Sequence, residues 1–139
     1  MNIYFCGSIR GGRGPQPVYA ALVNHLERGG HTVPTAHVAT PDVLGDERGY
    51  SPEEIYQRDV EWLDACEAVI AEVTQPSLGV GYEVAYALHQ ARKPVLCLCQ
   101  AGTPLSAMIL GNGDPLLRLV FYHDVAEALT AIDRFLVER

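Results

Sequence analysis

Long hydrophobic runs are missing from this sequence of 139 residues. No apolar stretch approaches the ~20 residues that span a membrane, and residues 1–5 lack the basic start and long apolar core of a signal peptide. Positive charge is also scarce, because 10 Lys and Arg face 17 Asp and Glu and the net charge is −7. We therefore expect neither a membrane nor a nucleic-acid polymer as partner, although a local anion site is compatible with this charge.

Motifs of several common nucleotide and hydrolase sites are absent as well. The first glycine-rich loop, residues 7–12, has the pattern G-x-x-x-G-G, and no acid closes the second expected strand, so an NAD site is disfavoured. There is no G-x-x-x-x-G-K-[ST] loop and no G-x-S-x-G elbow. The 5 histidines and 4 cysteines lack ligand spacing, so we expect no metal site. The cysteines lie in apolar runs, which is typical of reduced, buried thiols in a cytoplasmic protein.

Apolar runs and helical patterns alternate along residues 1–139. Short apolar runs predict parallel strands at residues 3–6, 31–36, 68–73, 94–99 and 119–122. Helical patterns lie between most of them, and the clearest begins at the capping box Ser51-Pro52-Glu53-Glu54. The alternation predicts one α/β domain with a doubly wound, five-stranded parallel sheet of the flavodoxin or Rossmann type and helices on both faces. Pro34 puts the second strand at an edge, and residues 37–50 are expected to form a long loop over a site.

The stretch from Thr74 to Glu83 is the most informative part of the chain. It joins a buried strand to a helix, a setting in which free backbone N–H groups point at an anion. Ser77 adds a hydroxyl, and Gly79 and Gly81 allow a ligand close to the backbone. Glu83 is expected in the first helical turn, at a pocket wall, where the helix N-terminus favours its ionised form. A phosphate cradle beside an ionised carboxylate predicts chemistry on a phosphorylated ligand.

A second carboxylate, Asp59, falls in the middle of the apolar face of the helix that begins at Pro52. A lone carboxylate on a core-facing stripe requires a reason. Two carboxylates at one crevice are what a retaining glycosidase uses, since one attacks the anomeric carbon and the other manages the leaving-group proton. Structural alternatives stay open: a helix-dipole partner for Glu83, and for Asp59 a buried cap or an ion pair with Arg10 or Arg58.

Several other side chains have two interpretations. Arg10 could bind phosphate or be solvated, and Tyr4 could line the crevice or belong to the core. His37 could reach the crevice or lie in a surface loop, and Ser77 could bind phosphate or only form a turn.

Four blocks of this sequence resemble the 2′-deoxynucleoside 5′-monophosphate N-hydrolases of the nucleoside 2-deoxyribosyltransferase superfamily. In the family's order they are residues 4–12, 59–63, 71–83 and 105–109. The third block, AEVTQPSLGVGYE, is highly specific, and the first, YFCGSIRGG, is moderately so. The resemblance implies hydrolysis of the N-glycosidic bond of a 2′-deoxynucleoside 5′-monophosphate to free base and 2-deoxyribose 5-phosphate, by a homodimer that needs no cofactor.

The resemblance also implies residue roles. Glu83 would be the nucleophile that forms a covalent 2-deoxyribosyl 5-phosphate intermediate, Asp59 the acid/base, and Tyr4 a neighbour of C2′ that leaves no room for a ribonucleotide hydroxyl. Ser106 would reach the phosphate from the neighbouring subunit. The other implied contacts are phosphate contacts from Gly7, Ser8, Ile9, Arg10, Gly11, Ser77 and Gly79, and base-side contacts from His37 and Met108.

The chain departs from the family pattern in three places. Residues 13–17 are richer in proline, Leu110 stands where a basic side chain is expected, and residues 38–50 are dissimilar, so base preference stays open. Two rival functions also remain: a nucleoside 2-deoxyribosyltransferase that exchanges bases, and a nucleotide-binding module without turnover. The expected phosphate contacts favour the hydrolase over transferases of unphosphorylated nucleosides, and a pure anion sensor has no use for two carboxylates.

Overall fold

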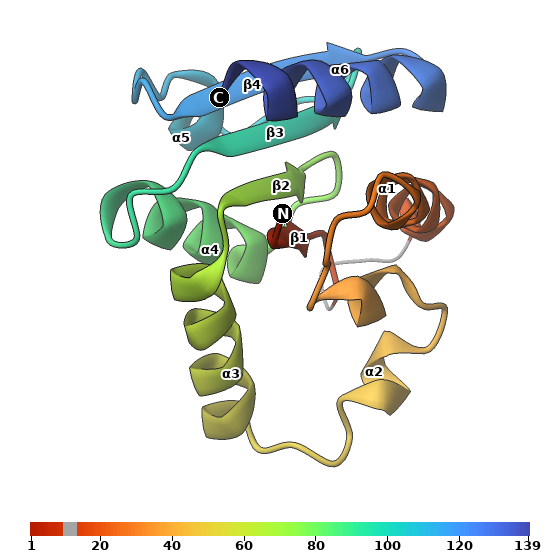
Figure 1. Ribbon diagram of the computed structural model, residues 1–139, viewed down its shortest axis with the longest axis vertical. Helices are drawn as coiled ribbons and strands as arrows, with labels where there is room; N and C mark the ends of the chain where they lie inside the picture. The colour runs from red at the N-terminus through yellow and green to blue at the C-terminus, as the bar shows by residue number, and fades with distance from the viewer. Residues whose placement is uncertain (10–13) are drawn as a thin grey trace.

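The computed structural model describes residues 1–9 and 14–139, and in them four strands form one parallel sheet (Figure 1). The strands lie in the order β1 (Ile3–Cys6), β2 (Ala68–Glu72), β3 (Val95–Gln100) and β4 (Leu117–Tyr122). Strands β1 and β2 are buried throughout, because a parallel sheet with both faces covered has no solvated side. The predicted α/β fold is confirmed, with one strand fewer than expected.

Residues 31–36 do not form the predicted second strand. A single bridge pairs this segment with the sheet, at Thr32. The N–H of Phe5 donates instead to the hydroxyl Oγ1 of Thr35, at 2.9 Å. Pro34 has no N–H with which to continue a backbone ladder, and on that side of β1 the Thr35 hydroxyl acts as the acceptor.

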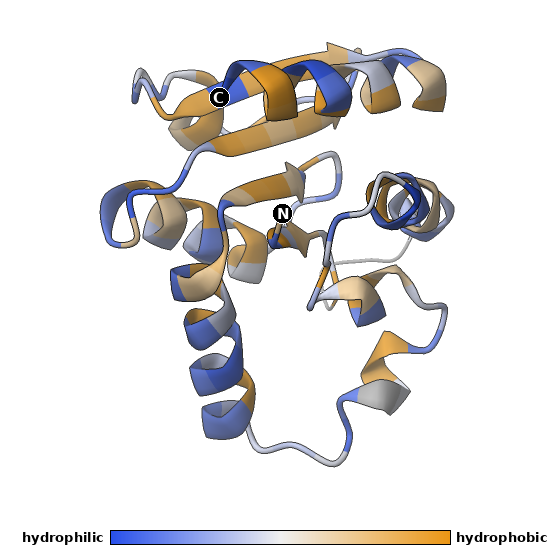
Figure 2. Ribbon diagram, viewed as in Figure 1, coloured by the Kyte–Doolittle hydropathy of each residue, from blue (hydrophilic) through white to orange (hydrophobic). Residues whose placement is uncertain are grey.

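Helices cover both faces of the sheet. Helices α1 (Gln16–Arg28) and α6 (Val125–Glu138) pack on one face, and α3 (Pro52–Ala65) and α4 (Leu78–His89) pack on the other. Figure 2 shows apolar residues concentrated in the strands, whereas much of α3 is hydrophilic.

Three short helices lie in the connections of the described chain: η1 (Ala36–Ala39), a 3-10 helix, α2 (Val43–Asp46) and α5 (Ala107–Leu110). The prediction of one long loop over residues 37–50 is therefore wrong in part, since η1 and α2 occupy much of this segment. The Asp42 carboxylate caps α2 by accepting the N–H of Gly45 at 3.1 Å, a local contact that carries no apolar periodicity to detect.

Alternation along β1 decides which of its side chains reach the site. Ile3 and Phe5 belong to the apolar cluster on the α1 and α6 side. Tyr4 and Cys6 belong to the cluster on the α3 and α4 side. Successive side chains of a strand point to opposite faces, so Tyr4 is directed toward α4.

Side-chain caps fix the starts of α3 and α4. The predicted capping box is confirmed, because Ser51 and Glu54 exchange two hydrogen bonds of 3.1 Å. Helix α4 begins at Leu78, and the Ser77 hydroxyl caps it. Glu83 therefore lies in the second turn of α4, and the predicted position in the first turn is wrong.

The four cysteines, Cys6, Cys66, Cys97 and Cys99, are free and buried, as their apolar neighbours predict. Burial raises the pKa of each thiol, which keeps them protonated near neutral pH. In residues 1–9 and 14–139 there is no helix with the length and apolar character needed to cross a membrane.

Candidate active site

A crevice of about 550 Å³ opens where β1 and β2 end. Its lining includes Gly7 and Ile9 after β1, and Ser77, Gly79 and Glu83 after β2. In doubly wound folds ligands bind outside the carboxyl ends of the strands. The described part of the first glycine-rich loop and the loop after β2 therefore border one crevice.

The Glu83 carboxylate is held at the crevice wall by Tyr4. The Tyr4 hydroxyl donates a hydrogen bond of 2.6 Å to Oε1 of Glu83. Burial raises the pKa of Tyr4 well above its usual range, and the Glu83 charge adds to this effect. Tyr4 therefore remains a hydrogen-bond donor at any physiological pH.

Burial raises the pKa of Glu83 to about 7, although the Tyr4 hydroxyl and the nearby Cys6 thiol act in the lowering direction. The prediction that the helix N-terminus favours the ionised form is wrong, because Glu83 lies one turn deeper and desolvation outweighs the helix dipole. Near neutral pH, Glu83 thus exists in both protonation states. Its ionised form is a carboxylate with little hydration, which suits a nucleophile.

Asp59 enters the same crevice from α3. Burial raises its pKa, while Arg58 lowers it. Of the alternatives left open by the sequence, the ion pair with Arg58 is present, with Nε at 2.9 Å from Oδ1 of Asp59. The charge of Asp59 in turn raises the pKa of Glu83, so the two carboxylates are close enough to affect each other's ionisation.

Sequence reasoning missed a third carboxylate of the crevice, Glu47. It follows α2 and is buried, and its Oε1 lies 3.1 Å from Nε2 of His37 and 3.4 Å from Nη2 of Arg58. His37 itself lines the crevice, as its predicted base-side position requires. No periodic pattern marks Glu47, so the sequence offered no signal by which to find it.

The predicted phosphate contacts divide into three groups. The residues that line the crevice are Gly7, Ile9, Ser77 and Gly79. Ser8 is fully buried, and its N–H donates to the Tyr19 hydroxyl at 2.9 Å, so this N–H is committed to the protein. Arg10 and Gly11 lie outside the described residues.

The structure places Ser106 and Met108 in a second cavity, of about 1010 Å³, between α4 and α5. Ser77 and Gly79 line both cavities. Within one chain, therefore, Ser106 and Met108 do not share the crevice of Glu83. Leu78 is 97% exposed and Met108 81% exposed beside this second cavity.

Comparisons with known proteins show which family this chain resembles. The family model of nucleoside 2-deoxyribosyltransferase matches residues 3–119. The 5-hydroxymethyl-dUMP N-hydrolase of Rattus norvegicus is 45% identical over 138 residues, covering 96% of this chain and 83% of the rat protein. The Homo sapiens protein of the same name is 44% identical over 137 residues, covering 96% of this chain and 78% of its own.

A solved structure, the CMP N-glycosidase of Clostridium botulinum, has the same fold. It matches with a TM-score of 0.74 at 18% identity, over 96% of this chain and 98% of its own.

Proposed function

This chain belongs to the nucleoside 2-deoxyribosyltransferase family, and on that premise we propose that it is an N-glycosidase of 2′-deoxynucleoside 5′-monophosphates. The products are the free base and 2-deoxyribose 5-phosphate. Relatives named as N-hydrolases of a deoxynucleotide support this reaction. The observation that carries the proposal is the crevice in which Tyr4 holds Glu83 and Asp59 shares the wall.

The proposed reaction proceeds through a covalent intermediate on Glu83. An oxygen of ionised Glu83 forms a bond to C1′ of the sugar, and the C1′–N bond breaks. The bonding electron pair leaves with the base, which takes a proton from Asp59. Water then attacks C1′ and gives its proton to Asp59, the ester bond breaks, and Glu83 is regenerated. This sequence is the two-carboxylate logic of retaining glycosidases.

The phosphate is proposed to bind at the start of α4. Backbone N–H groups at a helix N-terminus favour an anion, and Gly79 carries no side chain in its path. Ser77 supplies a hydroxyl that lines the crevice. Tyr4, packed below Glu83, is proposed to lie near C2′ and to exclude a ribonucleotide 2′-hydroxyl.

The working form is proposed to be a homodimer joined through the surface between α4 and α5. The exposed Leu78 and Met108 beside the cavity of Ser106 support this surface. Since Ser77 and Gly79 line both cavities, a second chain seated there would carry its own Ser106 toward the phosphate site.

The test is a substrate panel. Purified protein is incubated with the common dNMPs and 5-hydroxymethyl-dUMP, with the matching ribonucleotides, and with the unphosphorylated deoxynucleosides, and free base is quantified by chromatography. Release from deoxynucleoside monophosphates alone is expected. Release from unphosphorylated deoxynucleosides, together with base exchange when a second free base is added, would contradict the proposal in favour of a deoxyribosyltransferase.

A further inference from the structure

The guanidinium of Arg58 contacts the carboxylate of Asp59, the proposed acid/base, although Arg58 does not itself line the crevice. Nε and Nη2 of Arg58 each lie 2.9 Å from Oδ1 of Asp59. Both contacts are made to the same oxygen, so Arg58 leaves Oδ2 as the oxygen on which this carboxyl can carry a proton. Arg58 is not among the lining residues of the crevice, whereas Asp59 is. Arg58 is therefore placed to act on Asp59 rather than on a ligand.

The guanidinium is itself held on three sides. Its central carbon lies 4.8 Å from the ring centre of Trp62 and 5.5 Å from that of Tyr50, distances at which a cation is attracted to a ring. On the third side, Nη2 lies 3.4 Å from Oε1 of Glu47, whose side chain is only 5% exposed. Helices α2 and α3 stand apart in Figure 1, and the contact between Glu47 and Arg58 connects the two segments.

We infer that Arg58 is a positioning residue for Asp59: clamped by Glu47, Trp62 and Tyr50, it binds Oδ1 and presents Oδ2 to the departing base. This inference rests on the proposed function, in which Asp59 delivers the proton. A carboxyl with one oxygen fixed has one orientation in which to donate that proton, and pre-orientation of a reacting group is a large source of catalysis.

Charged and titratable groups from five elements face Asp59, and their signs differ. They are Arg58 on α3, Glu47 after α2, His37 on η1, Glu83 on α4 and Tyr4 on β1. Arg58 and His37 lower the pKa of Asp59, and Glu47 raises it. Removal of Arg58 and removal of Glu47 must therefore shift the ionisation of Asp59 in opposite directions, which simple loosening of the fold would not do.

The experiment follows the carboxyl carbon of Asp59 by ¹³C NMR during a pH titration of the full chain. Arg58→Gln is expected to raise the titration midpoint, and Glu47→Gln to lower it. Arg58→Lys keeps the charge and is expected to stay close to wild type. Arg48→Gln and Glu53→Gln are matched controls. Arg48 pairs with Asp42 and is 78% exposed, and Glu53 is exposed on α3, the helix that carries Arg58.

Kinetics on the deoxynucleotide panel then test the positioning role. Arg58→Gln is expected to lower kcat by about 10- to 100-fold, the equivalent of losing a hydrogen bond to a charged group, with little change in KM. Arg58→Lys is expected to recover part of kcat, since it restores the charge without the planar fork.

The outcomes separate the two proposals. An Asp59 midpoint that Arg58→Gln leaves unmoved would overturn the inference, and so would a midpoint that moves without any loss of kcat. Wild-type protein that releases no base, with midpoints that move as expected, would overturn the proposed function but support the link between Arg58 and Asp59.

Discussion

The hydroxyl of Tyr4 donates a 2.6 Å hydrogen bond to the carboxylate of Glu83, which lies 79 positions further along the chain. The contact exists because alternate residues of β1 face α4 and because α4 begins directly after β2. A buried phenol with no tendency to ionise is a fixed donor, and it holds the carboxylate at the crevice wall.

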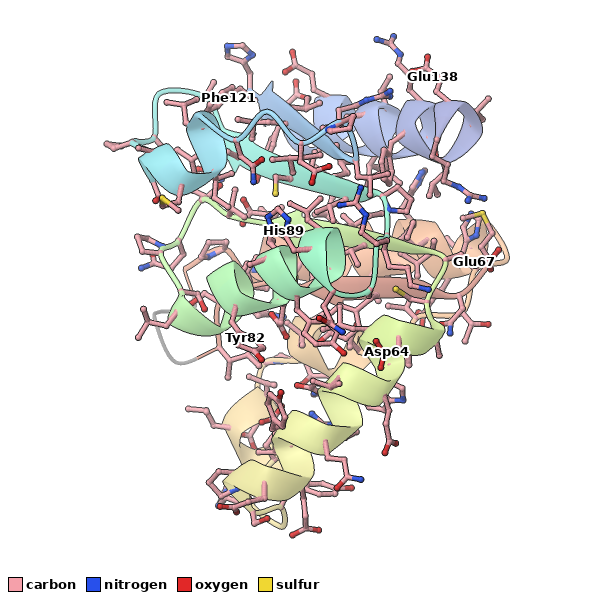
Figure 3. All side chains as sticks on the ribbon, turned by 90° about the vertical axis from the view of Figure 1, so that its left-hand side faces the viewer. Asp64, Glu67, Tyr82, His89, Phe121 and Glu138 are labelled. Carbon is pink, nitrogen blue, oxygen red and sulfur yellow. The ribbon has the colours of Figure 1, made fainter. Side chains whose placement is uncertain are left out.

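Tyr4→Phe is expected to lower kcat/KM by about 10- to 100-fold, since it removes one hydrogen bond to a charged group. The ring of Phe fills the same volume, so the fold should survive. Steady-state kinetics check this, with Tyr86→Phe as the control. Tyr86 lies on the same helix as Glu83, but its hydroxyl donates to Asp64 at 3.0 Å (Figure 3 labels Asp64). Equal losses in the two variants would contradict a specific role for Tyr4.

Glu83→Gln is expected to abolish turnover while deoxynucleotide binding is largely kept. The amide has the shape of the carboxylate but cannot form the ester to C1′. Base release measures turnover, and calorimetric titration with a dNMP measures binding. A variant that retains a near wild-type rate would show that Glu83 is not the nucleophile.

Glu83 also makes stability depend on pH. Its pKa is 4.5 in the unfolded chain and about 7 in the folded protein, so the folded protein binds this proton more tightly. The stabilisation is complete below pH 4.5 and is lost as pH rises through about 7. It amounts to at most about 3 kcal/mol, and to less where water enters the crevice.

Urea unfolding at about pH 5 and about pH 8 checks this dependence. The unfolding free energy of Glu83→Gln minus that of wild type should increase by about 2 kcal/mol from the lower to the higher pH. Glu53→Gln, an exposed change of the same kind, should show no such gain. A constant difference between Glu83→Gln and wild type would mean that Glu83 keeps its ordinary pKa in the fold.

Local sequence was enough to predict the parts of this site that depend on local pattern. Apolar runs located β1 and β2, and the capping box located the start of α3. Because the sequence also predicted that a helix follows β2 at once, it placed Glu83 of α4 at the expected crevice. These features depend on neighbours within a few residues.

The burial of a side chain and its contacts with residues far away in the sequence could not be predicted in the same way. The expected strand at residues 31–36 is missing, and a hydroxyl from Thr35 accepts the N–H of Phe5 at the edge of β1. Glu83 was expected to be readily ionised, but how far it lies from water depends on α4 packing against β1. Glu47 contacts Arg58 only in the folded chain, and no pattern in the sequence around Glu47 predicts this contact.

Mixing two inactive variants tests the proposed dimer. Glu83→Gln and Ser106→Ala are each expected to lower activity, and their mixed dimers should regain it at low substrate concentration. If Ser106 serves the site of the other subunit, each mixed dimer has one site with both native side chains and one site with neither. Ser77→Ala is the matched control, because Ser77 and Glu83 line one crevice of the same chain. Mixing Glu83→Gln with Ser77→Ala should therefore restore nothing, and equal recovery in both mixtures, or recovery in neither, would contradict a shared site.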